Sequence, residues 1–246
     1  MPIRNNKRVH KTRPHTIKTI KKRVMQEKAK PAFSERKKNP RNKQNYGKSE
    51  KIWNNETVYI IGGGPSLTNF DWNLLKDKKV IVINRAFEVL PKADVLYWTD
   101  SRFWKWYHTE IRDFKGLKFT CRPFSQIEND ITLLKAINRK PLELEPGNIS
   151  HGNNSGYGAI NLAVKLGATK IYLLGYDMSS AGPQTHWHDG YDVKHNHQIY
   201  SRMMKSFENL VPVLKENSIR VFNANPDSKL EVFNKCSIKS AIQDRM

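Results

Sequence analysis

Short apolar runs alternate with amphipathic segments along the chain from about residue 52 onward. Each run is almost continuously apolar and rich in β-branched residues, which is typical of strands buried on both faces of a parallel sheet. The pattern predicts six strands, at 57–62, 79–84, 94–100, 117–120, 170–175 and 219–224. Residues with helical spacing between them predict helices at 101–114, 131–139, 155–166 and 196–216.

Strands that alternate with helices in this way predict an α/β fold. We expect a single Rossmann-like domain over residues 51–246, with a mostly parallel sheet flanked by helices. Ligands bind such sheets at the carboxyl ends of the strands. The residues that follow each predicted strand are therefore the first candidates for a functional site.

Four predicted strands end in small, polar or acidic residues, which we interpret as candidate nucleotide-binding positions. They are Gly62, Gly63, Gly64, Pro65 and Ser66 after the first strand, Asn84 after the second, Asp100 after the third and Asp177 after the fifth. Glycines let backbone N–H groups approach a phosphate without a Cβ in the way. The alternative is a plain strand-to-helix turn. The spacing matches neither G-x-G-x-x-G nor the P-loop, so it indicates neither dinucleotide nor P-loop binding.

A second glycine-containing loop precedes the helix predicted at 155–166. Asn154 and Ser155 lie where N-caps belong, and Gly156 leaves the first turn without a side chain. A helix N-terminus of this kind attracts anions, so these three residues are candidates for a phosphate site. The alternative is close packing of the helix on the sheet, which also requires small residues.

Four histidines lie within twelve residues, at His186, His188, His195 and His197. One of the first three is expected to act as a general base. Two alternatives stay open: a metal site that also uses Asp189 and Asp192, and surface histidines without a role.

In the helix at 101–114, Trp104, Trp106 and Tyr107 are predicted to cover the sheet, and the alternative is an aromatic box for a base or a sugar.

The positive charge of the chain is concentrated at its N-terminus. Residues 1–50 contain 17 Lys and Arg against three acidic residues, which gives +14 of the total of +20. Few apolar residues accompany this charge, so we expect a disordered basic arm that binds nucleic acid without sequence preference.

Two cysteines exclude a disulfide framework and a cysteine-based zinc site. No apolar stretch is long enough for a signal peptide or membrane span, so a cytoplasmic location is expected, in the host cytoplasm if the protein is phage-encoded.

Three segments resemble a known group of proteins: "IIGGGPSL", "VINRAF" and "NSGYGAINLAVKLGATKIYLLGYD". They look like the G-N-G-P-S-L, N-Q-F-Y and T-S-G motifs of small bacterial sialyltransferases. The same skeleton occurs in motility accessory factors and in related hydroxymethylpterin pyrophosphokinases. The chain is most similar to phage-encoded relatives of these that share G-G-G-P-S-L and an H-W-H segment. The resemblance covers about residues 55–230.

The resemblance implies a nucleotide-binding transferase. It places Gly63, Gly64, Ser66 and Asn84 along the nucleotide, and Ser155 and Gly156 at its phosphate. It implies a histidine base after Asp177, with His188 or His195 in range. The asparagine of G-N-G is Gly63 here, a departure from the sialyltransferase pattern. Tyr176 and Tyr191 are the nearest candidates for the tyrosines that hold the leaving phosphate there.

From these observations we expect a glycosyltransferase-like enzyme that uses a CMP-sugar or another nucleotide-activated sugar, and that needs no metal if the helix N-terminus holds the phosphate charge. One alternative is a pyrophosphokinase-like enzyme with Mg²⁺ held by Asp100 and Asp177. The other is a non-catalytic phage accessory protein that binds nucleic acid through residues 1–50. The donor, the acceptor and the oligomeric state stay open.

Overall fold

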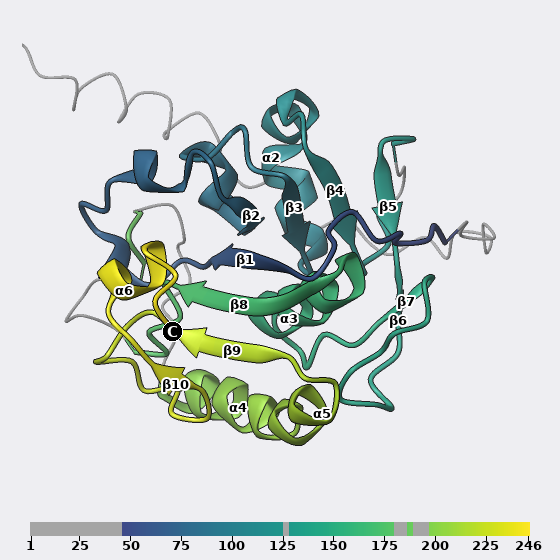
Figure 1. The fold of residues 1–246 in the computed structure, drawn as a ribbon. Coiled ribbons are helices and arrows are strands. Elements are labelled where there is room, and N and C mark those ends of the chain that lie inside the picture. The colour runs from purple at the N-terminus through teal and green to yellow at the C-terminus, as the bar shows by residue number, and fades with distance from the viewer. Residues whose placement is uncertain (1–45, 125–127, 180–185, 189–196) are drawn as a thin grey trace, which may run out of the picture. The chain divides into compact units, whose positions relative to one another are not determined.

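Eight parallel strands form one sheet in a computed structural model of the protein, which describes residues 46–124, 128–179, 186–188 and 197–246. Their order in the sheet is β10-β9-β8-β1-β2-β3-β4-β5 (Figure 1). The bounds are β1 Glu56–Ile61, β2 Lys79–Ile83, β3 Val95–Trp98, β4 Leu117–Thr120, β5 Ile131–Leu133, β8 Ala168–Leu174, β9 Arg220–Asn223 and β10 Asn234–Lys235. A separate pair consists of β6 (Lys135–Ala136) and β7 (Asn148–Ile149).

Helices cover both faces of this sheet, which confirms the predicted Rossmann-like α/β fold. One face carries α3 (Ser155–Leu166), α4 (His197–Glu208) and α5 (Leu210–Glu216). The other carries α2 (Ser101–Asp113) and the C-terminal α6 (Ile238–Ile242). Short 3-10 helices follow β1 and β2, at Pro65–Leu67, Trp72–Leu75 and Asn84–Glu88. No helix of the described residues is long and apolar enough to cross a membrane.

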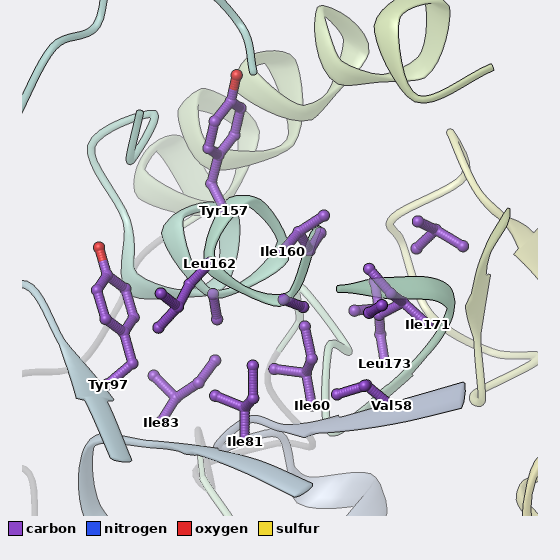
Figure 2. Close-up of a cluster of buried hydrophobic side chains, with 14 of the residues drawn as sticks. Val58, Ile60, Ile81, Ile83, Tyr97, Tyr157, Ile160, Leu162, Ile171 and Leu173 are labelled. Atoms are coloured by element: carbon purple, nitrogen blue, oxygen red, sulfur yellow. The ribbon is translucent and has the colours of Figure 1, made fainter. Parts of the chain in front are cut away.

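The core has two layers because successive side chains of each strand point to opposite faces. In β1, Val58 and Ile60 contribute to the layer under α3, whereas Tyr59 and Ile61 belong to the layer on the other face. Figure 2 shows the first layer, with Ile160 and Leu162 of α3 packed over the strands. These four side chains of β1 are buried, which explains why the strand is apolar from Val58 to Ile61.

The structure corrects the helix predicted at 131–139. Residues Ile131–Leu133 instead form β5, which pairs in parallel with β4, and Lys135–Ala136 form β6. Ile131 and Leu133 are buried and Thr132 is half-buried, so the burial has the two-residue period of a strand. The segment is short and contains β-branched residues, so pairing with the sheet outweighs its helical spacing.

The single helix predicted at 196–216 is divided into α4 and α5 at Asn209. Pro212 lies three residues after this break. A proline has no N–H to donate to the carbonyl four residues earlier, here that of Glu208, and its ring collides with that carbonyl. The long helix therefore ends at Glu208 and a new one begins at Leu210.

The folded unit begins before the predicted boundary at residue 51. Gln44–Met246 forms one compact unit. Gly47 N–H donates to the Leu133 carbonyl at 2.9 Å, and Ser49 N–H donates to the Pro146 carbonyl at 2.9 Å. The last residues of the predicted arm are therefore part of the fold, and the rest of the arm lies outside the described residues.

Candidate functional site

A cavity of about 380 Å³ lies at the carboxyl ends of the central strands. The chain leaves β1 in one direction through β2 to β5 and returns on the other side of β1 as β8, so β1 and β8 form the switch point of the sheet. Ligand sites of open α/β sheets lie at such points. The loops after β1, β2, β3 and β8 all line this cavity.

Most of the predicted site residues meet in this cavity. Its lining includes Gly62, Gly63, Gly64, Asn84, Asp100, Asn154, Ser155, Gly156, Asp177 and His186. Pro65, Ser66 and His188 are close in the chain to lining residues but are not part of the lining. His195, Tyr191 and the metal site suggested with Asp189 and Asp192 lie outside the described residues.

The three glycines after β1 allow the chain to pack closely against itself. A Cβ on Gly62 would lie 2.7 Å from the Gly175 carbonyl oxygen, and one on Gly64 would lie 2.6 Å from the carboxylate carbon of Asp177. A Cβ on Gly63 would lie 2.7 Å from the ring of His186. None of the three has the positive φ that favours glycine. The glycines are therefore required by close neighbours rather than by a turn.

Asp177 fixes the loop that follows β1. Its carboxylate accepts hydrogen bonds from the backbone N–H and the hydroxyl of Ser66, both at 2.6 Å. The side-chain amide of Asn225 donates a third bond at 2.9 Å. Asp177 is 4% exposed, so these bonds compensate for the burial of its charge. The hydroxyl of Ser66, predicted to contact a nucleotide, is directed to this carboxylate instead.

Trp187 attaches the histidine segment to the glycine loop. Its backbone N–H donates to the Gly63 carbonyl at 3.0 Å, and its indole N–H donates to the Gly62 carbonyl at 3.1 Å. The indole packs on Trp72, with 5.4 Å between ring centroids. The rings of His186 and His188 stack on each other with 5.2 Å between centroids, and of the two only His186 lines the cavity.

His188 is held in its neutral form. Its Nδ1 lies 3.3 Å from Nη1 of Arg85, which always donates, so the imidazole proton belongs on Nε2. Burial, the Arg85 charge and neighbouring His186 lower the pKa of His188 to about 3. A general base needs an unprotonated nitrogen directed at the substrate. The one on His188 faces Arg85, which leaves His186 as the better placed of the two.

The N-terminus of α3 forms the wall of the cavity opposite the glycine loop. Asn154, rather than Ser155, is the N-cap: its Oδ1 accepts the Tyr157 N–H at 2.7 Å. Within the described residues, no hydrogen bond engages the backbone N–H groups of Ser155 and Gly156. The Ser155 hydroxyl accepts from Thr99 N–H at 3.2 Å and lies 2.8 Å from the Thr99 hydroxyl.

Three of the seven non-glycine residues with positive φ in the described part of the chain line the cavity. Asn84, Asn153 and Met178 line it with φ values of 50°, 63° and 51°, and Gly175 lines it with 71°. Left-handed backbone is unfavourable for residues other than glycine, and most of all for a side chain such as that of methionine. Asn153 is supported by His151, whose Nδ1 accepts the Asn153 N–H at 3.0 Å. Strain of this kind is common at binding sites.

The two carboxylates proposed for Mg²⁺ do not fit a metal site. Both Asp177 oxygens accept hydrogen bonds within the protein. Asp100 forms a paired hydrogen bond with the Arg102 guanidinium, at 2.6 Å to Nη2, and caps α2. Burial raises the pKa of Asp100, but the Arg102 side-chain and backbone bonds outweigh burial and lower it overall. In the described part of the chain, no group of three or more His, Cys, Asp or Glu side chains forms a metal site.

Several lining residues were absent from the sequence prediction. They include Thr99, Arg102, Asn153, Tyr200 and Met203. Trp106, which also lines the cavity, was named only in the alternative of an aromatic box. Thr99 directly precedes Asp100, so the strand-end rule would have found it. No local signal marks Tyr200 and Met203, because α4 reaches the cavity only through the fold. Tyr176 is not available as a phosphate ligand, since its hydroxyl donates to the Gly156 carbonyl at 3.1 Å.

No family model matches the chain, and no curated protein matches it. Among solved structures, the chain is similar to the sialyltransferase CstII from Campylobacter jejuni in complex with a substrate analogue, cytidine-5'-monophosphate. The identity is 17%, the match covers 75% of this chain and 86% of that one, and the TM-score is 0.47. An alpha-2,3-sialyltransferase from Campylobacter jejuni in apo form has 16% identity, coverage of 79% and 85%, and a TM-score of 0.44.

Proposed function

We propose that this domain is a nucleotide-dependent transferase that moves a glycosyl group from a nucleotide-activated sugar to an acceptor hydroxyl. One observation carries the proposal: the N–H groups at the start of α3, which no described residue accepts, and the imidazole of His186 line the same cavity at the switch point of the sheet. The first can hold a phosphate and the second can accept a proton.

The start of α3 would hold the leaving nucleotide. Negative charge develops on the phosphate as the glycosyl bond breaks, and aligned N–H groups at a helix N-terminus stabilise it. Ser155 and Gly156 provide these groups. The Ser155 hydroxyl accepts from Thr99 N–H and donates to Asn84 Oδ1 at the long distance of 3.5 Å, so its proton would turn from Asn84 to a phosphate oxygen.

His186 would deprotonate the acceptor. The acceptor oxygen attacks the anomeric carbon, the bond from that carbon to the phosphate oxygen breaks, and the acceptor proton passes to the imidazole. The departing nucleotide keeps the electron pair of the broken bond. The resemblance to small bacterial sialyltransferases implies a histidine base after Asp177 but favours His188 or His195, whereas the cavity lining supports His186. The bonds from Trp187 to the glycine loop keep the histidine segment in place for this role.

The binding half of the proposal is tested by calorimetric titration of CMP, UMP, GMP and AMP, with and without Mg²⁺. Ser155→Ala removes a bond to a charged group, so the affinity for the best nucleotide should fall about ten- to a hundredfold. Thr169→Ala is the matched control, because it removes a hydroxyl bonded to the Asn55 carbonyl at the opposite end of β8. If the wild-type protein binds none of the four nucleotides, the proposal is wrong.

The catalytic half is tested by nucleotide release from a panel of CMP-, UDP- and GDP-sugars. His186→Ala should lower the rate about 10²- to 10⁴-fold and leave the affinity for the free nucleotide unchanged, because the base acts only on the acceptor. His188→Ala is the comparison within the same segment and should have the smaller effect on the rate. Equal rates for wild type and His186→Ala would remove His186 from the mechanism.

A further inference from the structure

The aromatic side chains of helix α2 have different surroundings. Trp104 stacks on Phe124 with 4.6 Å between ring centroids, and Tyr107 packs on Phe103 at 5.0 Å. Trp106, by contrast, is 45% exposed and lines the cavity. The first two cover the sheet, as the helical spacing predicts. The indole of Trp106 forms part of the cavity wall, and it is not needed to cover the sheet.

An ion pair beside Trp106 leaves this part of the cavity without net charge. Arg102 lies one helical turn before it, with the guanidinium carbon 5.5 Å from the indole centroid. That guanidinium is paired with the Asp100 carboxylate at 2.6 Å. The pair has no net charge, so the surface beside the indole does not favour a second phosphate. It suits an uncharged planar ring with polar atoms along its edge.

The order of the strands places this surface relative to the proposed phosphate site. Ser155 contacts Thr99 at the end of β3 and lies 3.5 Å from the Asn84 side chain at the end of β2. His186 lies against Gly63, at the end of β1. Because β2 separates β1 from β3, the phosphate site lies between His186 on one side and Trp106 on the other.

The chemistry of transfer decides which part of the donor lies on which side. The base that activates the acceptor has to be close to the anomeric carbon, so the glycosyl group lies on the His186 side of the phosphate. The nucleoside is attached to the other side of the same phosphate and extends over β3. It therefore reaches α2, which begins at Ser101 just after β3 and has the exposed Trp106 in its second turn.

We propose that Trp106 is the stacking platform for the nucleobase of the donor. This inference rests on the proposed function and adds the position of the base to it. Stacking is tolerant of base identity, since every base has a π-face. Trp106 should therefore determine how tightly a nucleotide binds, and the polar groups around it should determine which nucleotide is preferred.

The test compares probes with and without a base. Trp106→Ala should weaken binding of the best of CMP, UMP, GMP and AMP by about five- to 150-fold, the range for loss of one base–aromatic contact. Affinity for ribose 5-phosphate should stay unchanged, because that probe has the sugar and phosphate but no base. Trp106→Phe should retain most of the nucleotide affinity. Leu117→Ala is the control, since Leu117 is also 45% exposed but is the first residue of β4. It therefore lies at the amino ends of the strands, whereas the cavity lies at their carboxyl ends.

Each outcome of this test is decisive. Equal losses for the nucleotide and ribose 5-phosphate would mean that Trp106 supports the phosphate site, and no loss would make it a surface residue. A loss confined to nucleotide-sugars, with free nucleotides unaffected, would place the glycosyl group there instead. All three results overturn the inference but leave the proposed function intact. Failure of the wild-type protein to bind any nucleotide would refute both.

Discussion

The imidazole of His186 fills the space that a side chain at Gly63 would need. A Cβ on Gly63 would lie 2.7 Å from Cδ2 of His186, closer than real Cβ contacts come. Since Trp187 is bonded to the carbonyls of Gly62 and Gly63, the segment that contains the histidine cannot simply move away. The glycine loop and the proposed base therefore form one unit, although they are far apart in the sequence.

Gly63→Ala should displace the ring of His186 and lower the transfer rate at least tenfold, while nucleotide affinity changes less. The reason is that the new methyl group collides with His186 and not with the start of α3. The rate is measured by nucleotide release and the affinity by calorimetry. Gly147→Ala is the control, because a Cβ there meets only the Gly47 carbonyl oxygen, at 3.5 Å. A Gly63→Ala variant with wild-type rate would show that the contact has no functional consequence.

Asp177→Asn should destabilise the fold by about 1.5–3 kcal/mol, the net value of a hydrogen bond to a charged group. The neutral amide has one acceptor oxygen, whereas the carboxylate accepts from both donors of Ser66 and from Asn225. Urea unfolding at pH 7 measures the free energy. Asp227→Asn, a control at an exposed position two residues after Asn225, should unfold like wild type. Similar unfolding midpoints for the two variants would show that the hydrogen bonds of Asp177 with Ser66 and Asn225 do not stabilise the fold.

Stability should fall as the pH decreases from about 6.5 toward 3, in part because of His188. The pKa of His188 is lowered from 6.5 to about 3 by burial, Arg85 and His186. Between these pH values the unfolded chain binds more protons than the folded protein. The contribution of neutral His188 to the stability of the fold is therefore complete above pH 6.5 and is lost as the pH falls toward 3. His188→Gln can still accept from Arg85 but does not titrate there, so its stability should depend less on pH.

Urea unfolding of both proteins at pH 7.5, 6, 5 and 4 measures this difference. The comparison with the variant is necessary because burial and Arg122 also lower the pKa of His151. His151 contributes a loss of the same sign to both proteins, and the subtraction removes it. Parallel curves over the whole range would show that His188 titrates normally in the fold.

The basic arm should account for nucleic-acid binding. Full-length protein should bind DNA and RNA weakly, without sequence preference and with steep salt dependence, because lysines and arginines displace counterions from phosphates. The 44–246 fragment should lose most of this affinity and keep its melting temperature. The cut belongs at residue 44 because Gly47 and Ser49 are hydrogen-bonded to the fold. Fluorescence anisotropy at 50 and 200 mM salt compares the two, and equal binding would move the contact to the folded domain.

The sequence by itself determined the elements whose signals are local. Continuous apolar runs predicted β1 and β2 because strands buried on both faces need no polar side chains. The helix at Ser155–Leu166 was predicted because its cap, its apolar stripe and the glycine that ends it all lie within one segment. The same strand-end rule predicted Asn84 and Asp100 as lining residues, since parallel strands end at one edge of the sheet.

Only the tertiary structure decided what these residues contact. The Ser66 donors and the Asp177 carboxylate are 111 residues apart, and they meet because β8 pairs with β1, which no local pattern specifies. The same pairing brings the segment after β8 against the glycine loop, where Gly63 leaves space for His186 and Gly64 leaves space for Asp177. Pairing with β4 likewise made a strand of Ile131–Leu133, whose spacing alone favoured a helix. Hydrophobic periodicity indicates which face of an element is buried, whereas its neighbours depend on strand order, which is set by the packing of the whole domain.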